Sequence, residues 1–200
     1  MAIDKNPDNP PYYSAKATIY DNRDEKLYEK YVQLMDSVHE YKKKAFQNRF
    51  DAKKKAKFEK LQKEAEQKAE AKKEEAEKVF KKADDLYAKA LEKDSSFFNA
   101  AFNRGRLYYK KHERRAAESD LIFKIYKDGD RADKVMAKVD PALRKSAEFF
   151  EMAHKANPKD IATVDILRSI YFKLRDKEKQ QKYLEILSEL NKNKVQSDEM

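Results

Sequence analysis

The chain has 200 residues, a length that suits one or two domains. It contains two glycines, five prolines and no cysteine, which predicts an almost entirely helical chain and excludes disulfides and thiolate chemistry. Charged residues make up 42% and the formal net charge is +9, yet 12 Tyr and 11 Phe are more than a disordered chain carries, so we expect a hydrophobic core. No run reaches the roughly 18 apolar residues of a membrane span.

The first half of the chain predicts long helices with few breaks. Two prolines suit the first turn of a helix over residues 10–20. A short polar turn is expected at residues 21–24, where Asp24 is a good N-cap for a second helix over 25–46. Beyond it, no glycine or proline interrupts residues 51–91, so we expect one helix of about 40 residues, about 60 Å long.

The second half alternates shorter helices with clearer turns. Residues 127–130 form the clearest turn, because Gly129 tolerates a positive φ. Asp140 and Pro141 predict an N-cap followed by proline at the first helical position, and residues 131–139 are left open between a loop and a short helix. The expected helices of this half cover residues 97–111, 113–126, 140–157, 160–174 and 176–190, followed by a tail over 191–200.

The positive charge is concentrated in one segment. Residues 42–82 contain 16 Lys and Arg against eight Asp and Glu, so this segment holds nearly all the excess. Three interpretations are open: a solvated helix stabilised by nearby Glu–Lys pairs, a patch that binds nucleic acid or another anionic surface, or coiled-coil pairing with residues 25–46 or with another chain. The candidate patch residues are Lys42, Lys43, Lys44, Arg49, Lys53, Lys54, Lys55 and Lys57.

Between residues 82 and 117, small residues alternate with aromatic residues at helical spacing. Two antiparallel helices need this alternation if their backbones are to approach closely and interlock. The small residues are Ala83, Ala90, Gly105 and Ala117, and the aromatic residues are Tyr87, Tyr108 and Tyr109. The stretch resembles a tetratricopeptide (TPR) repeat, a helix pair of about 34 residues.

The resemblance covers residues 2–35 and 76–190, with Gly105 and Pro158 at the glycine and terminal proline positions of the family. The ending is similar to that of interrupted TPR proteins from Bacteroidetes-type bacteria, although Arg168 stands where the family has glycine. The resemblance implies an all-α, TPR-like helical-repeat solenoid with a long lysine-rich helical insertion. Its parts are a partial N-terminal repeat (2–41), the lysine-rich helical or coiled-coil insertion (42–75), C-terminal repeats (76–190) with a short insertion at 127–139, and a flexible tail (191–200).

The resemblance also implies a binding groove on the concave face of the solenoid. Aromatic side chains flanked by Asn and Arg suit an extended peptide, because amides meet its backbone and the guanidinium meets its acids. The alternative for Phe102 and Tyr109 is packing between helices. The positions that face the groove are Asn99, Phe102, Arg106 and Tyr109 in the middle unit, and Ala162, Asp165, Ser169 and Phe172 in the last.

Catalytic chemistry has little support in the sequence. His39, His112 and His154 lie far apart, and no glycine-rich phosphate-binding motif is present. We therefore expect no catalytic residue, no metal and no cofactor.

The sequence thus predicts a non-enzymatic scaffold that binds a protein or peptide in its groove. Two alternatives are binding of an anionic polymer, nucleic acid included, through the basic helix over 42–82, and a structural segment of a larger envelope-associated repeat protein. The first residues carry no apolar signal segment. As written, the chain is expected in the cytoplasm, or in the periplasm or cell envelope if it is trimmed from an exported protein.

Overall fold

The computed structural model describes residues 6–198, and residues 2–5 of the expected N-terminal repeat lie outside them. Within the described residues all regular structure is helical, which confirms the all-α prediction. None of these helices combines the length and apolar character that crossing a membrane requires. The helices are α2 (Pro10–Gln47), α3 (Ala52–Lys93), α4 (Phe98–Tyr126), α5 (Gly129–Met136), α6 (Val139–Ala156), α7 (Ile161–Lys173) and α8 (Lys177–Asp198).

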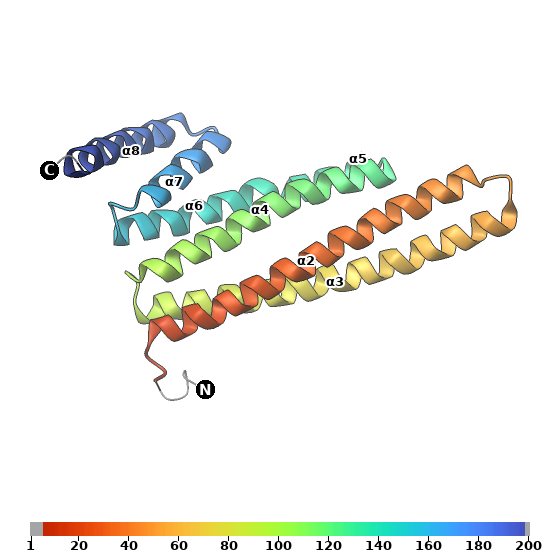
Figure 1. Cartoon of the computed structure of the whole chain (residues 1–200), viewed down its shortest axis with the longest axis horizontal. Coiled ribbons are helices and arrows are strands. Elements are labelled where there is room, and N and C mark those ends of the chain that lie inside the picture. Colours follow the sequence, from red (N-terminus) through yellow and green to blue (C-terminus); the bar gives the residue numbers. More distant parts are fainter. Residues whose placement is uncertain (1–5, 199–200) are drawn as a thin grey trace.

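The helices form a stack of antiparallel pairs (Figure 1). Helices α2 and α3 make a long hairpin, α4 packs against α6 with the short α5 at its far end, and α7 packs against α8. Adjacent pairs also contact each other, α4 lying on α2 and α3, and α7 on α6. Figure 1 shows the start of α2 and the end of α8 toward one end of the long axis, and the α2–α3 turn at the other.

Small residues let the helix axes approach closely in the part of the stack opposite the α2–α3 turn, as the alternation predicts. Ala83 and Ala90 of α3 are fully buried around Tyr87. Gly105 of α4 lies against Phe150 of α6, so close that an added Cβ would stand 2.9 Å from the ring. The hydroxyl of Ser146 donates a hydrogen bond of 2.8 Å to the Gly105 carbonyl, which fixes α6 on α4. Glycine is therefore required here by a close approach of two helices.

The expected turn at residues 21–24 is wrong, because α2 continues through it. Asp21 and Asp24 are 7% and 2% exposed and face α4. Lys110 pairs with Asp21 at 3.2 Å, and Arg114 pairs with Asp24. Neither glycine nor proline breaks the helix in this stretch, and the carboxylates that suggested a turn are satisfied by cations from a distant helix.

The expected break near His112 is also wrong, because α4 runs unbroken for 29 residues. Ala117, expected in the packed face of a second helix, is exposed on α4. The antiparallel partner of α4 is instead α6. The intervening residues are good helix formers, so nothing local stops the helix before Lys127.

Several helix ends differ from the sequence prediction by a few residues. The left-handed residue that ends α4 is Lys127, with φ of 56°, whereas Gly129 begins α5 without a positive φ. Residues 131–139 thus belong largely to a short helix. Helix α6 begins at Val139, which places Asp140 and Pro141 inside its first turn rather than at its cap. The expected tail from residue 191 continues α8 as far as Asp198.

The lysine-rich helix packs along its neighbour rather than standing alone. Its first half forms a seam with α2, in which Ala65 and Ala69 meet Tyr31, Met35 and Val38. Ile125, near the end of α4, closes this cluster. Of the three interpretations left open, the structure therefore shows pairing with residues 25–46 of the same chain.

Candidate functional site

The candidate site lies between α4 and α7. One carboxylate shapes the loop before α4, and another caps the start of α7. The Asp94 carboxylate accepts hydrogen bonds from the backbone and hydroxyl of Ser96 at 2.9 and 2.7 Å, which shapes the loop before α4. Asp160 accepts from the Thr163 amide at 2.8 Å and caps α7, as the sequence predicts. Both helices then present one face to a shared hollow.

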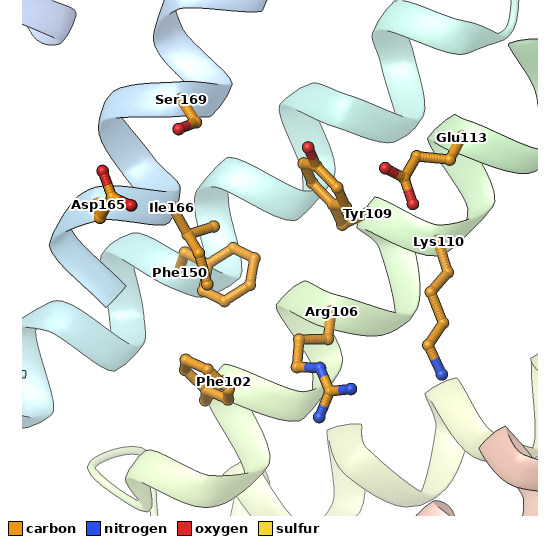
Figure 2. Close-up of a pocket in the computed structure, with 9 residues that line it drawn as sticks. All are labelled: Phe102, Arg106, Tyr109, Lys110, Glu113, Phe150, Asp165, Ile166 and Ser169. Atoms are coloured by element: carbon orange, nitrogen blue, oxygen red, sulfur yellow. The ribbon is translucent and has the colours of Figure 1, made fainter. Parts of the chain in front are cut away.

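That hollow is a pocket of about 530 Å³ (Figure 2). In Figure 2, α4 supplies one wall, α7 the opposite wall, and the Phe150 ring from α6 lies between them. The lining residues are Phe102, Arg106, Tyr109, Lys110, Glu113, Phe150, Asp165, Ile166 and Ser169.

The floor of the pocket is aromatic. Phe150 is 1% exposed, and the Phe102 ring meets it edge-on with centroids 5.4 Å apart. Phe98 stacks behind Phe102 at 5.5 Å. Phe102 therefore packs between helices and lines the pocket at once, so the two interpretations offered by the sequence are compatible.

The rim carries separated charges. Lys110 is held by Asp21 and Glu25 of α2 at 3.2 and 3.1 Å, and its hydrogen bond lowers the pKa of Glu25. Across the pocket, Asp165 accepts from the Arg168 guanidinium at 2.7 Å.

Arg106 differs from these paired charges. It is exposed, and within residues 6–193 the structure gives its guanidinium no ion pair. Arg106 is thus the cation at this rim that remains free to meet an acid.

Five of the predicted groove residues line this one pocket: Phe102, Arg106, Tyr109, Asp165 and Ser169. Asn99, Ala162 and Phe172 do not line it and are exposed. The sequence reasoning missed four lining residues. Glu113 was hidden by the break expected at residue 112, and Lys110 and Ile166 sit beside predicted positions, one residue along the helix. Phe150 was not among the predicted groove residues, and its ring reaches α4 because Gly105 leaves room for it.

A second hollow of about 640 Å³ lies between α3 and α4. Some of its lining charges are paired: Lys111 binds Glu77 at 2.8 Å, and Asp84 binds Arg104 at 2.7 Å. The Lys111 ammonium also sits 3.8 Å from the centre of the Phe80 ring. Eight of its ten lining residues are charged, and the Phe80 ring is largely buried, so we consider this hollow the weaker candidate.

The predicted basic patch divides in two. Lys42 points inward, where its ammonium donates to the Ile125 carbonyl at 2.7 Å and lies 5.1 Å from the centre of the Tyr126 ring. The others are exposed around the α2–α3 turn. Two form pairs along α3, Lys54 with Asp51 at 3.2 Å and Lys55 with Glu59 at 3.7 Å.

Metal-binding groups are absent from the part of the chain that the structure describes, where no three His, Asp or Glu side chains converge. The three histidines remain far apart, with His112 Nδ1 lying 3.3 Å from the Val139 carbonyl and His154 packed against Tyr183.

Comparisons with known proteins leave the family open. No family model, no curated protein and no solved structure matches this chain.

Proposed function

We propose that this protein is a TPR-like, non-enzymatic scaffold that binds an extended peptide segment of a partner protein in the pocket between α4 and α7. The observation that carries the proposal is that candidate groove residues from two helices line the same pocket. Positions that the resemblance assigns to the concave face of two successive units, such as Arg106 and Asp165, line a single pocket.

The helix pairing supports the repeat interpretation in an altered form. The three pairs are α2 with α3, α4 with α6, and α7 with α8. In this register the first helices are α2, α4 and α7, and the middle unit is lengthened by the far half of α4 and by α5. The extra segment of the middle unit, which is the far half of α4 with α5, is therefore longer than the insertion expected at 127–139. Its α4 part packs on the far half of the α2–α3 hairpin.

The pocket chemistry defines the kind of segment it would accept. An apolar side chain would cover the half-buried Phe102 ring, where burial gives most of the affinity. A carboxylate would pair with Arg106, because a guanidinium binds carboxylates through two parallel hydrogen bonds. A basic residue would pair with Asp165 on the opposite wall of the pocket, or with Glu113 two turns along α4 from Arg106. An extended peptide with an acid, an apolar residue and a base in turn fits this order.

The test uses the full chain and a synthetic peptide library. Peptides of about ten residues would be selected on the immobilised protein and measured by fluorescence anisotropy. We expect Phe102→Ala with Arg106→Ala to weaken the selected peptides at least about tenfold, since buried aromatic and Arg contacts dominate such interfaces. Selected sequences should be enriched in acidic residues beside apolar ones.

The control is Asn99→Ala with Phe172→Ala, two exposed candidates outside the pocket, which should leave affinity unchanged. Lys53→Glu with Lys54→Glu and Lys55→Glu should also retain it. Selected peptides that bind the pocket double variant as tightly as the parent would overturn the proposal.

A further inference from the structure

The far end of the α2–α3 hairpin exposes two large apolar side chains. Phe46, in the last turn of α2, is 69% exposed, and Phe50, in the turn itself, is 89% exposed. Figure 1 shows this turn projecting past the end of α5, away from the other helices. We call residues 42–57 the hairpin tip.

The tip also holds most of the positive charge of its segment. Residues 42–57 contain eight basic residues and one acidic residue, Asp51. Residues 58–82, by contrast, contain eight basic residues and seven acidic ones. The excess that the sequence locates broadly in 42–82 is therefore concentrated where the two phenylalanines are exposed.

Arg49 links the charge to the rings. Its guanidinium carbon lies 4.9 Å from the centre of the Phe46 ring and 4.6 Å from that of Phe50. The arrangement is a compact Phe–Arg–Phe group on a convex turn, with exposed lysines on both helices behind it.

The fold does not account for this group. The last buried residue of α2 is Ala45, and the first buried residue of α3 is Ala65. Phe46 and Phe50 thus lie beyond the seam that joins the two helices.

We propose that the hairpin tip docks on an anionic phospholipid bilayer. Phe46 and Phe50 would enter the boundary between headgroups and acyl chains, while Arg49 and the exposed lysines would remain among the lipid phosphates and carboxylates. Aromatic side chains favour this boundary, and basic residues near it are attracted to anionic lipid within a Debye length. Long lysine side chains can reach the headgroups while the apolar part of the tip is buried.

The geometry favours a bilayer over nucleic acid. A strand of nucleic acid is bound in a groove with aromatic faces open for base stacking. The tip is convex, and Arg49 already lies over both rings. Seven of its eight cations are lysines, which act as point charges and lack the paired donors with which arginine grips phosphates.

The test is co-sedimentation of the full chain with phosphatidylcholine vesicles, with and without about 30 mol % phosphatidylserine. We expect binding only to the anionic vesicles, weakening as salt rises. Phe46→Ser with Phe50→Ser should reduce the partition coefficient at least about tenfold, because each ring loses its burial in lipid. Lys53→Glu with Lys54→Glu and Lys55→Glu should reduce it further.

Matched controls separate lipid docking from general stickiness. Ile19→Ser with Phe123→Ser removes two side chains that are 68% and 53% exposed elsewhere, and should leave vesicle binding unchanged. Circular dichroism melts should be the same for the tip double variant and the parent. The proposal is overturned if the intact chain ignores anionic vesicles, or if the two Phe substitutions leave binding intact. Salt-sensitive DNA or RNA binding without vesicle binding would instead assign the tip to nucleic acid.

Discussion

The two ends of the molecule use phenylalanine in opposite ways. At the end opposite the hairpin tip, Phe102 and Phe150 meet edge-on. Phe150 is almost completely buried because Gly105 lets α6 approach α4. At the hairpin tip, Phe46 and Phe50 are covered by one guanidinium and otherwise exposed. The difference is the number of helix layers. At one end further helices cover the rings of Phe102 and Phe150, whereas at the tip α2 and α3 stand alone and no other helix covers Phe46 and Phe50.

Between these ends, α4 is held on the α2–α3 hairpin partly by charge. Asp21 and Asp24 of α2 face Lys110 and Arg114 of α4. Tyr28 adds to this contact, because its hydroxyl donates to the Arg114 carbonyl at 3.0 Å. Burial raises the pKa of the Tyr28 hydroxyl to about 12, so this hydroxyl stays protonated as a donor. The stack thus changes from aromatic packing to ion pairs to exposed charge along its length.

The largest effect should come from filling the close approach at the apolar end. We expect Gly105→Leu to lower the free energy of unfolding by about 2–4 kcal/mol, because the added side chain would overpack against Phe150. Chemical denaturation measures the change. Gly129→Ala is the matched control, since nothing lies within 4 Å of an added Cβ there. A Gly105→Leu protein that unfolds like the parent would show that the two helices do not meet as described.

A smaller effect should follow from breaking the charged middle. Arg114→Met leaves Asp24 buried without its partner, and we expect a loss of about 2–3 kcal/mol near neutral pH. Burial raises the pKa of Asp24, and Arg114 opposes this rise. Without Arg114, the folded-state pKa of Asp24 lies further above its unfolded value. The stability gained from a protonated Asp24 is therefore present at low pH and lost as the pH rises through the folded-state pKa.

A double variant separates the loss of the ion pair from the cost of leaving one buried charge unpaired. Asp24→Leu with Arg114→Met removes both charges, and it should regain most of the stability, because apolar residues often replace a buried ion pair without loss. Denaturation of the two variants at about pH 7 and about pH 4 measures both expectations. Arg114→Met that is equally destabilising at both pH values would show that Asp24 is not the group left unpaired.

The sequence was informative where a local signal decides the structure. Helix α3 begins one residue after Asp51, whose carboxylate accepts from the Lys54 amide at 3.0 Å, and it ends within two residues of the predicted boundary. The glycine of the repeat pattern marks a real close approach. Five candidate groove residues converge on one pocket, because spacings of three or four residues place three of them on one face of α4 and two on one face of α7.

The errors share a physical cause. Asp21 and Asp24 suggested a turn, since short carboxylates usually cap helices, but their partners lie almost 90 residues away on α4. In α4 a distant contact adds to the local signal: no glycine or proline stands near residue 112, and contact with the α2–α3 seam also stabilises the far half of the helix. The tip was recognised as basic, but the exposure of its rings depends on where α4 and α5 end, short of the α2–α3 turn.

The smallest expected effect concerns the contact between α6 and α8, at the end of the molecule opposite the hairpin tip. His154 of α6 meets the Tyr183 ring edge-on at 5.6 Å, and its Nδ1 atom is buried without a partner among the described residues. Burial, and then the nearby Lys182, lower the pKa of His154 below its usual 6.5, while Glu151 opposes them.

The folded state therefore holds a neutral imidazole, and the stability linked to it is present above about pH 6.5 and lost as pH falls through the lower, folded-state pKa. We expect the melting temperature to fall by about 1–2 °C more in the parent than in His154→Gln when the pH is lowered from about 7.5 to about 5.5. His39 and His112 are present in both proteins, as are Lys182 and Glu151, so the difference isolates His154. Equal losses in the two proteins would mean that the imidazole is solvated and that α8 packs on α6 through its apolar residues alone.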